Sequence, residues 1–436
     1  MINFKNKKIA VIGEGVEGVS SFDFLKKMGA KITILDKKQG KDYLKNLEEY
    51  DLVVRSPGIK LELLKNIPKE KITSQTKLFF ELCPCPIIGV TGTKGKGTTS
   101  ALIYEMLKKQ GFDAYLGGNI GVPPFEFLDK LNVHSKVVLE LSSFQLIDID
   151  KSPNIAVLLM TTSEHLDYHK SQEEYVDAKR NILRFQKDTD FAIINKDYLV
   201  SRESDTETNG EIYYVSREDD CNRGCFVKDN AIYIKDKSLE EKIINTKDIL
   251  IPGVHNYENA CAASMAAYLS GVSVQNISYV LKNFKGLEHR LELVATINGV
   301  KYYDDSFSTV PETAIAAIHS FENPEILILG GSSKNSDFTS LGKVIKDTKN
   351  IKAIIGIGIE WEKIKEKIIG LNPDVLVLEG AKNMQTIVTA AAKLATLGDV
   401  VLLTPSCASF DMFENYKDRG NQFKKEVLAL KQNESN

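Results

Sequence analysis

The sequence predicts an α/β protein of three domains, in which mostly parallel sheets are covered by helices. Strand-like and helix-like segments alternate through most of the 436 residues, which is the pattern of parallel strands joined by crossover helices. Several strand-like segments are continuously apolar, as expected for strands that are buried on both faces. The chain is also too long for a single hydrophobic core, because domains usually contain about 100–200 residues.

The composition is typical of a soluble globular protein, with 43% hydrophobic and 26% charged residues and a net charge of −3. We therefore expect no nucleic-acid partner. The sequence has no apolar run long enough to span a bilayer and no signal-peptide pattern, so we expect a cytoplasmic protein that binds no membrane. We also expect a monomer, although the sequence itself does not reveal the oligomeric state. Six scattered cysteines lack the paired spacing of a zinc site, and we expect free thiols.

The first predicted domain, residues 1–85, begins with a strand at 7–13 and a glycine-rich turn, Gly13–Gly18. Asp36 ends the next predicted strand. Glycines at a strand–helix turn let the backbone approach a pyrophosphate, and the acid can bind a ribose hydroxyl. The pattern predicts a nucleotide diphosphate without distinguishing NAD from a UDP-sugar, and the glycines could instead serve close helix–strand packing. A third strand at 51–59 and a Pro-rich linker at 83–86 complete this domain.

The second predicted domain, residues 86–286, contains the stretch GVTGTKGKGTTS at 89–100. This stretch follows a predicted strand and precedes a helix predicted over 98–110, which ends at Gly111. It departs from the common phosphate-loop pattern at Val90 and Gly97. Its glycines, lysines and threonines still offer N–H groups, positive charge and a helix N-terminus to the phosphates of ATP. Lys96 would contact the β- and γ-phosphates, and the Thr98 hydroxyl would bind Mg²⁺.

Two strands at 136–144 and 154–162 follow the loop. Glu140 interrupts the first of them, and a carboxylate buried there must pair with an arginine or bind a metal ion. The segment TTSEHLDYH after the second strand offers His165 as a ligand beside the predicted Mg²⁺-ATP site, although a lone histidine could instead be structural. Lys179, on the next helix, is by composition alone a solvated helix lysine. The polar region 200–250 carries a hairpin signal.

The third predicted domain, residues 287–436, has strands near 325–331, 351–358, 374–380 and 399–407 and is expected to form a second doubly wound sheet. Polar residues at or just beyond strand ends predict a cleft, because open α/β sheets bind ligands there; these residues are Asp305, Lys334 and Ser409. Asn256 begins a helix rich in small residues, and Arg290 lies near the junction of the second and third domains. We expect a hinge near residues 285–290.

The loop pattern G-x-T-G-T-x-G-K-x-T resembles that of the Mur ligase family. Further blocks in family order extend the resemblance over essentially the whole chain: GEGVEGVS, SPGI, GGNIG, LELSSFQL, HLDYH, YVDAKR, GVHNYENA, HRLE, YYDDS, LGGSSK and SCASFDMFENYKDRGNQF. The order is similar to that of the members that join D-glutamate to UDP-N-acetylmuramoyl-L-alanine. The resemblance implies that ATP phosphorylates the substrate carboxylate and that the amine of D-glutamate attacks the acyl phosphate.

The resemblance also implies a set of site residues. The UDP-substrate would contact Val16, Glu17, Asp36, Ser56, Gly58, Asn119 and His165. ATP would contact Gly92, Thr93, Lys94, Gly95, Lys96, Gly97, Thr98, Asn256, Arg290 and Asp305. D-Glutamate would contact Thr309, Lys334, Ser409 and Tyr416. One Mg²⁺ ion would bind Thr98 and Glu140, and a second would bind His165 and a carbamylated Lys179. The catalytic residues would be Lys96, His165 and Lys179.

The sequence departs from the family pattern at two positions. Phe307 stands where many members have a lysine, and Tyr416 stands where a phenylalanine is common. The loss of a cation near the reaction centre would weaken the stabilisation of a phosphate or carboxylate, unless Lys94 or another side chain compensates. It could also change which amino acid is accepted.

Other functions stay open from the sequence. Other Mur ligases share the core, and folylpolyglutamate synthase has a similar loop but generally lacks the Rossmann-like N-terminal domain. The block SCASFDMF favours the D-glutamate enzymes. An NAD-binding protein with a regulatory ATPase domain, or a non-catalytic nucleotide-binding scaffold, belongs to a different class. Titration with NADH would distinguish the NAD-binding protein, because a UDP-sugar site should not bind it.

Overall fold

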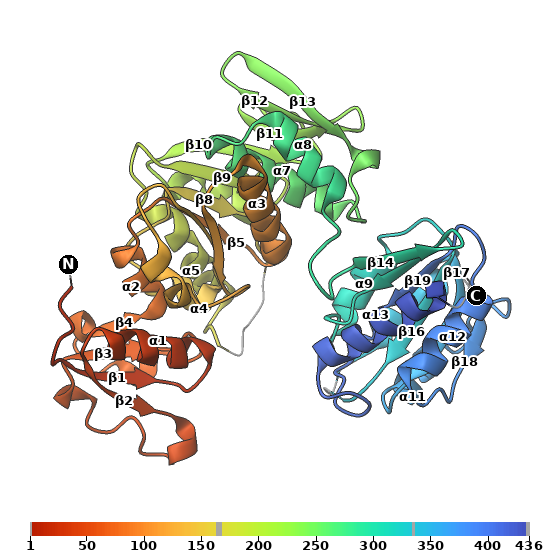
Figure 1. The fold of residues 1–436 in the computed structure, drawn as a ribbon, viewed down its shortest axis with the longest axis horizontal. Coiled ribbons are helices and arrows are strands. Elements are labelled where there is room, and N and C mark those ends of the chain that lie inside the picture. Colours follow the sequence, from red (N-terminus) through yellow and green to blue (C-terminus); the bar gives the residue numbers. More distant parts are fainter. Residues whose placement is uncertain (1, 163–167, 334–335, 433–436) are drawn as a thin grey trace. The chain divides into compact units, whose positions relative to one another are not determined.

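The computed structural model describes residues 2–162, 168–333 and 336–432 (Figure 1). Three sheets follow one another along the chain, and the predicted α/β class is confirmed. The chain divides into two compact units. The first unit comprises Met1–Ile249 and Tyr257–Asn283, and the second comprises Leu250–Asn256 and Phe284–Asn436. The first two sheets lie in the first unit and the third in the second, while the predicted domain boundaries stay predictions.

The first sheet has four parallel strands in the order β2-β1-β3-β4. Its elements are β1 (Lys8–Ile12), α1 (Val16–Lys27), β2 (Lys31–Leu35), β3 (Leu52–Arg55), β4 (Ile72–Ser74) and α2 (Gln75–Leu82). Alternate residues of β1 face opposite sides, as in any strand. Ile9 and Val11 join a core that also contains Leu139 of the second sheet, whereas Ala10 and Ile12 face a separate small core.

The second sheet has nine strands in the order β13-β12-β11-β10-β9-β8-β5-β7-β6. Its strands are β5 (Ile87–Thr91), β6 (Ala114–Gly118), β7 (Lys136–Glu140), β8 (Ile155–Leu158), β9 (Phe191–Asn195), β10 (Glu211–Ser216), β11 (Gly224–Lys228), β12 (Ala231–Asp236) and β13 (Leu239–Asn245). The β11–β12 and β12–β13 pairings are antiparallel and the others are parallel. The predicted hairpin in the polar region is therefore confirmed, as β11 and β12.

Six α-helices lie among the described residues of this part of the chain: α3 (Lys96–Gln110), α4 (Ser143–Leu146), α5 (Gln172–Arg184), α6 (Leu199–Arg202), α7 (His255–Leu269) and α8 (Val274–Asn283). The predicted helix after the loop is α3. It begins two residues earlier than predicted, at Lys96, and ends as predicted at Gly111, which takes a left-handed conformation with φ 93°. Glycine adopts this conformation without the steric cost that a Cβ imposes.

The third sheet has the order β14-β15-β19-β16-β17-β18, and only the β14–β15 pair is antiparallel. Its strands are β14 (Glu292–Ile297), β15 (Val300–Asp304), β16 (Glu325–Gly330), β17 (Ile351–Ile357), β18 (Leu376–Leu378) and β19 (Val400–Leu403). Its helices are α9 (Pro311–Ile318), α10 (Thr339–Asp347), α11 (Trp361–Lys367), α12 (Met384–Leu394) and α13 (Tyr416–Gln432).

Both faces of this sheet are buried, as a doubly wound fold requires. Ile326 and Ile328 of β16 pack in the core formed with α12 and α13. Leu327 and Leu329 of the same strand pack in the core formed with α9, α10 and α11. This explains why β16 is apolar at successive positions. Among the described residues, no helix is long and apolar enough to cross a membrane.

Candidate active site

The glycine-rich loop lies at the carboxyl end of β5, where α3 begins. Gly92 has φ 153° and Gly95 has φ 85°, so the backbone bends in a way that favours glycine. The Lys96 ammonium donates to the carbonyl oxygens of Gly92 and Thr93, each at 3.1 Å. The Lys179 ammonium, from α5, also donates to Gly92 O, at 2.8 Å. The two predicted catalytic lysines that the structure describes therefore converge on one carbonyl group.

Lys179 is buried, with only 2% of its surface exposed. The composition-based prediction of a solvated lysine is therefore wrong. The amphipathic helix α5 turns this residue toward β5, where its Nζ lies 3.5 Å from Thr91 Oγ1 and 4.7 Å from the centre of the Tyr175 ring. Burying an ammonium is costly unless specific partners compensate. This cost makes a buried lysine beside a phosphate-type loop a candidate for chemistry.

Glu140, the last residue of β7, is also buried, at 7% exposure. Its Oε1 accepts from Asn119 Nδ2 at 3.4 Å, and its carbonyl oxygen accepts from Asn119 N at 2.9 Å. Among the described residues no arginine pairs with Glu140, so the arginine alternative finds no support. Thr98 is half-buried in the first turn of α3 and makes no hydrogen bond to Glu140 in the described part of the chain. His165 lies outside the described residues.

Asn259 of α7 is a loop neighbour that the sequence reasoning missed. The Thr99 hydroxyl donates to Asn259 Oδ1 at 3.4 Å. A Cβ added at Gly95 would lie 2.2 Å from the same oxygen. The only sequence signal for Asn259 was its position one helical turn after Asn256. Asn256 itself belongs to the second unit, and its Nδ2 donates to Pro252 O at 2.6 Å.

The predicted nucleotide residues of the first sheet gather around its glycine-rich turn. Asp36 accepts from the backbone amides of Glu14, at 2.9 Å, and Lys38, at 3.0 Å. These backbone hydrogen bonds lower the pKa of Asp36. Ser56 Oγ donates to Gly13 O at 3.4 Å, and Val16 is 75% exposed at the start of α1. Gly58 is exposed on the loop that follows β3.

Arg55 organises that loop and was missed, although an arginine inside the apolar run DLVVRSPG was a visible signal. Its guanidinium donates to the carbonyl oxygens of Pro57 and Ile59, both at 3.0 Å. It also forms an ion pair with Asp148, with NH2 at 2.8 Å from Oδ1. The Arg55 side chain is fully buried. Arg55 therefore ties the predicted nucleotide loop to the segment after α4.

Glu17, predicted to contact the UDP-substrate, lies against α4. Its Oε1 accepts from Gln145 Nε2 at 2.6 Å. Its Oε2 is buried with no hydrogen-bond partner among the described residues. Burial raises the pKa of Glu17 to about 7, although the Gln145 hydrogen bond and the charge of Arg55 oppose that shift.

In the second unit, Asp305 and Arg290 lie together. The Asp305 carboxylate is buried and accepts from Leu291 N at 3.1 Å and from Thr404 Oγ1 at 3.0 Å. Burial raises the pKa of Asp305 to about 7. The Arg290 guanidinium lies 3.9 Å from the centre of the Phe307 ring. Both predicted ATP residues therefore belong to one turn–strand junction at the carboxyl end of β15.

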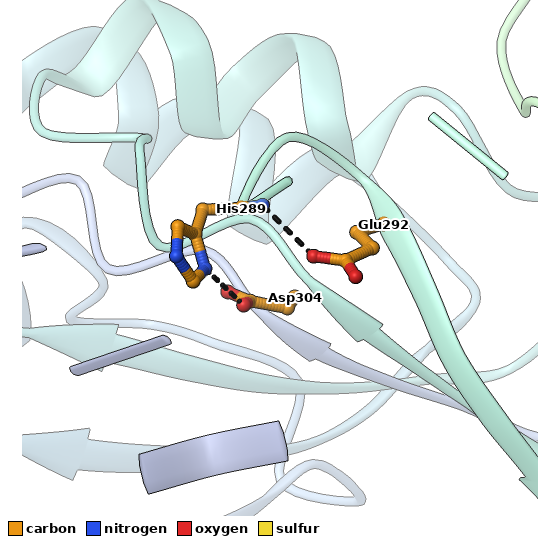
Figure 2. A group of neighbouring side chains, drawn as sticks. All are labelled: His289, Glu292 and Asp304. Atoms are coloured by element: carbon orange, nitrogen blue, oxygen red, sulfur yellow. Dashed lines mark hydrogen bonds and ion pairs between the residues drawn. The ribbon is translucent and has the colours of Figure 1, made fainter. Parts of the chain in front are cut away.

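His289, Glu292 and Asp304 form the cluster in Figure 2. His289 Nδ1 lies 2.7 Å from Asp304 Oδ2, and the His289 backbone amide donates to Glu292 Oε2 at 3.0 Å. Three such groups can bind a cation, but Lys424 already pairs with Glu292 at 3.1 Å. The cluster orders the turn that presents Arg290, a turn in which His289 itself takes a positive φ of 63°.

The described residues that are predicted to bind D-glutamate come from two neighbouring parts of the second unit. Thr309 is half-buried on the loop between β15 and α9, Ser409 is buried after β19, and Tyr416 is the first residue of α13. Ser306 Oγ, in the loop before Thr309, donates to Tyr416 O at 2.7 Å. Lys334 lies outside the described residues.

Arg419 joins these two parts and was also missed. Its guanidinium donates to Ser306 O, at 2.9 Å, to Cys407 O, at 3.1 Å from NH2, and to Ala408 O, at 3.2 Å. The side chain is buried, and this burial lowers the pKa of Arg419 to about 10. Its sequence signal was weak, because arginines near the start of a helix are normally solvated.

Family models and known proteins agree with this architecture. A "Mur ligase middle domain" model matches residues 90–267, and a "Mur ligase, glutamate ligase domain" model matches residues 289–407. The chain thus belongs to the Mur ligase family and is a ligase.

Within the family, the chain is similar over nearly its whole length to UDP-N-acetylmuramoylalanine--D-glutamate ligases. It is 40% identical to that of Acetivibrio thermocellus and 39% identical to that of Clostridium acetobutylicum, with 98% of this chain and 97% of each relative covered.

Solved structures share the fold. A UDP-N-acetylmuramate-alanine ligase from Thermotoga maritima has a TM-score of 0.60 at 17% identity, covering 97% of this chain and all of that chain. A UDP-N-acetylmuramoyl-L-alanyl-D-glutamate--2,6-diaminopimelate ligase has a TM-score of 0.61 at 17% identity, covering 98% of this chain and 93% of that chain. The three-domain Mur ligase architecture predicted from the sequence is confirmed.

Proposed function

We propose that this protein joins D-glutamate to UDP-N-acetylmuramoyl-L-alanine at the expense of ATP, in the cytoplasm and as a monomer. One observation carries the proposal from the structure: Lys96 and Lys179, distant in sequence, both donate to Gly92 O in the glycine-rich loop. This arrangement supports the proposal, because both lysines would then lie beside the backbone that binds the phosphates. The similarity to D-glutamate ligases at 40% identity supports the choice of substrates.

The reaction activates a carboxylate. The L-alanine carboxylate of the first substrate attacks the γ-phosphorus of ATP, and ADP leaves with the bridging oxygen. The acyl phosphate then has a good leaving group, and the D-glutamate amine attacks its carbonyl carbon. The tetrahedral intermediate expels phosphate and forms the amide. The protein contributes mainly by positioning the reactants and by neutralising charge during phosphoryl transfer.

Each predicted site residue that the structure describes has a proposed role in that scheme. The loop residues Gly92, Thr93, Lys94, Gly95, Lys96, Gly97 and Thr98 bind the phosphates with N–H groups and positive charge at the start of α3. Asn256, Arg290 and Asp305 bind the rest of ATP. Val16, Glu17, Asp36, Ser56, Gly58 and Asn119 bind the UDP-substrate. Thr309, Ser409 and Tyr416 bind D-glutamate. His165 and Lys334 complete the assignments by resemblance alone.

The donor set suits magnesium. Glu140 is a buried carboxylate whose described partner is a neutral amide, and Thr98 offers a hydroxyl at the first turn of α3; a hard cation prefers such oxygen ligands. Magnesium bound there would neutralise charge on the ATP phosphates. A second ion would use His165 and Lys179. Carbamylation would turn the Lys179 ammonium into an oxygen ligand and would remove a buried positive charge.

The decisive test is ADP release by the purified protein with UDP-N-acetylmuramoyl-L-alanine, adding D-Glu, L-Glu, D-Asp or L-Lys in turn. We expect turnover with D-Glu only. Turnover with another amino acid and not with D-Glu would overturn the substrate assignment. Phe307 and Tyr416 make this comparison necessary, because they replace the usual family residues at these positions.

Isotope labelling tests the acyl phosphate itself. With ¹⁸O in the L-alanine carboxylate, one labelled oxygen should appear in the released phosphate. Unlabelled phosphate, formed at the normal rate, would exclude phosphorylation of the substrate carboxylate.

A further inference from the structure

Phe307 occupies an unusual place between two groups that the proposed function assigns to different substrates. Its ring is 37% exposed on the loop that follows β15. The Arg290 guanidinium lies 3.9 Å from the ring centre, within cation–π range. The Tyr416 ring lies 5.1 Å away at an interplanar angle of 90°, an edge-to-face contact. One aromatic side chain thus contacts both a proposed ATP residue and a proposed D-glutamate residue.

The backbone fixes the ring in this position. The Phe307 amide donates to His289 O at 3.0 Å, which joins its loop to the turn that carries Arg290. The preceding residue, Ser306, donates from Oγ to Tyr416 O at 2.7 Å. His289 is held in turn by Asp304, as Figure 2 shows. Both neighbours of the ring are therefore tied to the loop that bears it.

Contact with the Phe307 ring restrains the Arg290 side chain. Arg290 is exposed, and an exposed arginine side chain samples many rotamers and loses that freedom when it binds a phosphate. A flat aromatic surface beside the guanidinium restricts those rotamers before the ligand arrives. Preorganisation of this kind increases affinity without adding a contact to the ligand.

We propose that Phe307 is a positioning residue that holds Arg290 for ATP, with Tyr416 supporting the ring from its edge. The proposal rests on the proposed function, because it takes Arg290 as an ATP-binding group. The proposal explains how an uncharged side chain can serve at position 307, where many family members have a lysine. The Phe307 ring supplies no positive charge, but it positions the positive charge of Arg290.

A double-mutant cycle tests the proposal. Phe307→Leu keeps apolar bulk and removes the aromatic face, while Phe307→Tyr keeps that face. We expect Phe307→Leu to raise the KM for ATP about two- to fivefold with little change in kcat, because an exposed cation–π contact is weak. Phe307→Tyr should stay within about twofold of the parent KM. In an Arg290→Ala background, Phe307→Leu should change the KM no further.

Three results decide the question. An equal rise of the KM in both backgrounds, or an equal rise in the Tyr variant, would overturn the positioning role. No effect of Arg290→Ala on the KM for ATP would instead contradict the assignment of Arg290 in the proposed function. Thermal melting of each variant separates both outcomes from misfolding, and Phe307→Met provides a second non-aromatic variant if the Leu variant is unstable.

Tyr279 supplies a matched control. It is 50% exposed, and the Lys109 ammonium lies 3.7 Å from its ring centre, at the end of α3 that is remote from the glycine-rich loop. Tyr279→Leu removes a comparable cation–π contact and should leave the KM for ATP unchanged. A similar rise in this variant would show that the effect is not specific to Arg290.

Discussion

At the scale of single residues, the site depends on buried charged side chains that hold loops in place. Lys179, Arg55 and Arg419 are each nearly or fully buried, and each donates to backbone carbonyl groups of a loop. Carbonyl oxygens accept these hydrogen bonds without neutralising the charge. Such groups are costly to bury, so their positions mark where loop geometry has to be held.

Lys179→Gln tests the most exceptional of these residues. Glutamine keeps a polar side chain but can neither be carbamylated nor carry the ammonium that contacts Gly92 O. We expect the rate of ADP release to fall about 10- to 100-fold, which is the loss typical when a metal site is disturbed. Circular dichroism should show that the variant keeps its fold. Lys109→Gln, at the far end of α3, serves as the control and should retain the parent rate. A normal rate in the Lys179 variant would remove this residue from the chemistry.

At the scale of elements, the strands of the third sheet carry a buried acid unrelated to the site. Glu325 begins β16 with its side chain fully buried. Its Oε1 accepts from Asn350 Nδ2 at 2.9 Å, while Oε2 has no partner among the described residues. Burial raises the pKa of Glu325 from 4.5 to about 8.

This shift predicts a pH-dependent stability. Between pH 4.5 and about 8 the folded state holds a proton on Glu325 that the unfolded state has lost, so stability falls as pH rises through this window. Glu325→Gln removes the titration. We expect it to raise the unfolding free energy of the second unit by roughly 1–3 kcal/mol at pH 8 and to change it little at pH 4.5. Calorimetric melts at the two pH values measure the difference, and an equal effect at both would contradict the assignment.

At the scale of the whole molecule, the first two sheets share one compact unit because a core and an ion pair join them. Ile9 and Val11 of the first sheet pack in the same cluster as Leu139 of the second. Arg55 adds a buried link to Asp148, which is only 14% exposed. The predicted nucleotide loop is therefore held by the segment after α4 as well as by its own sheet.

Arg55→Leu should loosen that link. It leaves Asp148 without its main partner, and the expected cost is about 3–5 kcal/mol, as for other broken buried ion pairs. We also expect a higher KM for UDP-N-acetylmuramoyl-L-alanine and an unchanged KM for ATP. The nearby pair Lys77–Asp150 is more exposed, at 22% and 52%, so Lys77→Ala should cost less than about 1 kcal/mol. Equal losses in the two variants, measured by denaturant unfolding, would contradict the structural role of Arg55.

Much of this molecule follows from local sequence pattern. Alternating apolar segments predict the three α/β sheets. Gly111 predicts where the helix after the glycine-rich loop ends, because glycine readily takes the left-handed conformation at a helix end. The glycine-rich loop, and its match to the Mur ligase pattern, predict the nucleotide chemistry, because backbone N–H groups at a strand–helix turn act locally.

Tertiary structure alone decided which charged side chains are buried and what they contact. Composition makes Lys179 an ordinary surface lysine, and no local pattern distinguishes Arg419 from a solvated arginine. Arg55 stands out inside an apolar run, but the run does not reveal its partner. Each of the three has a partner that is distant in sequence: Lys179 reaches Gly92, Arg419 reaches Ser306, and Arg55 reaches Asp148. Likewise, Phe307 is an isolated departure from the family pattern in the sequence, and only the folded structure shows that its ring contacts Arg290 and Tyr416. Sequence patterns report interactions between near neighbours, whereas the cost and use of a buried charge depend on groups that only folding brings together.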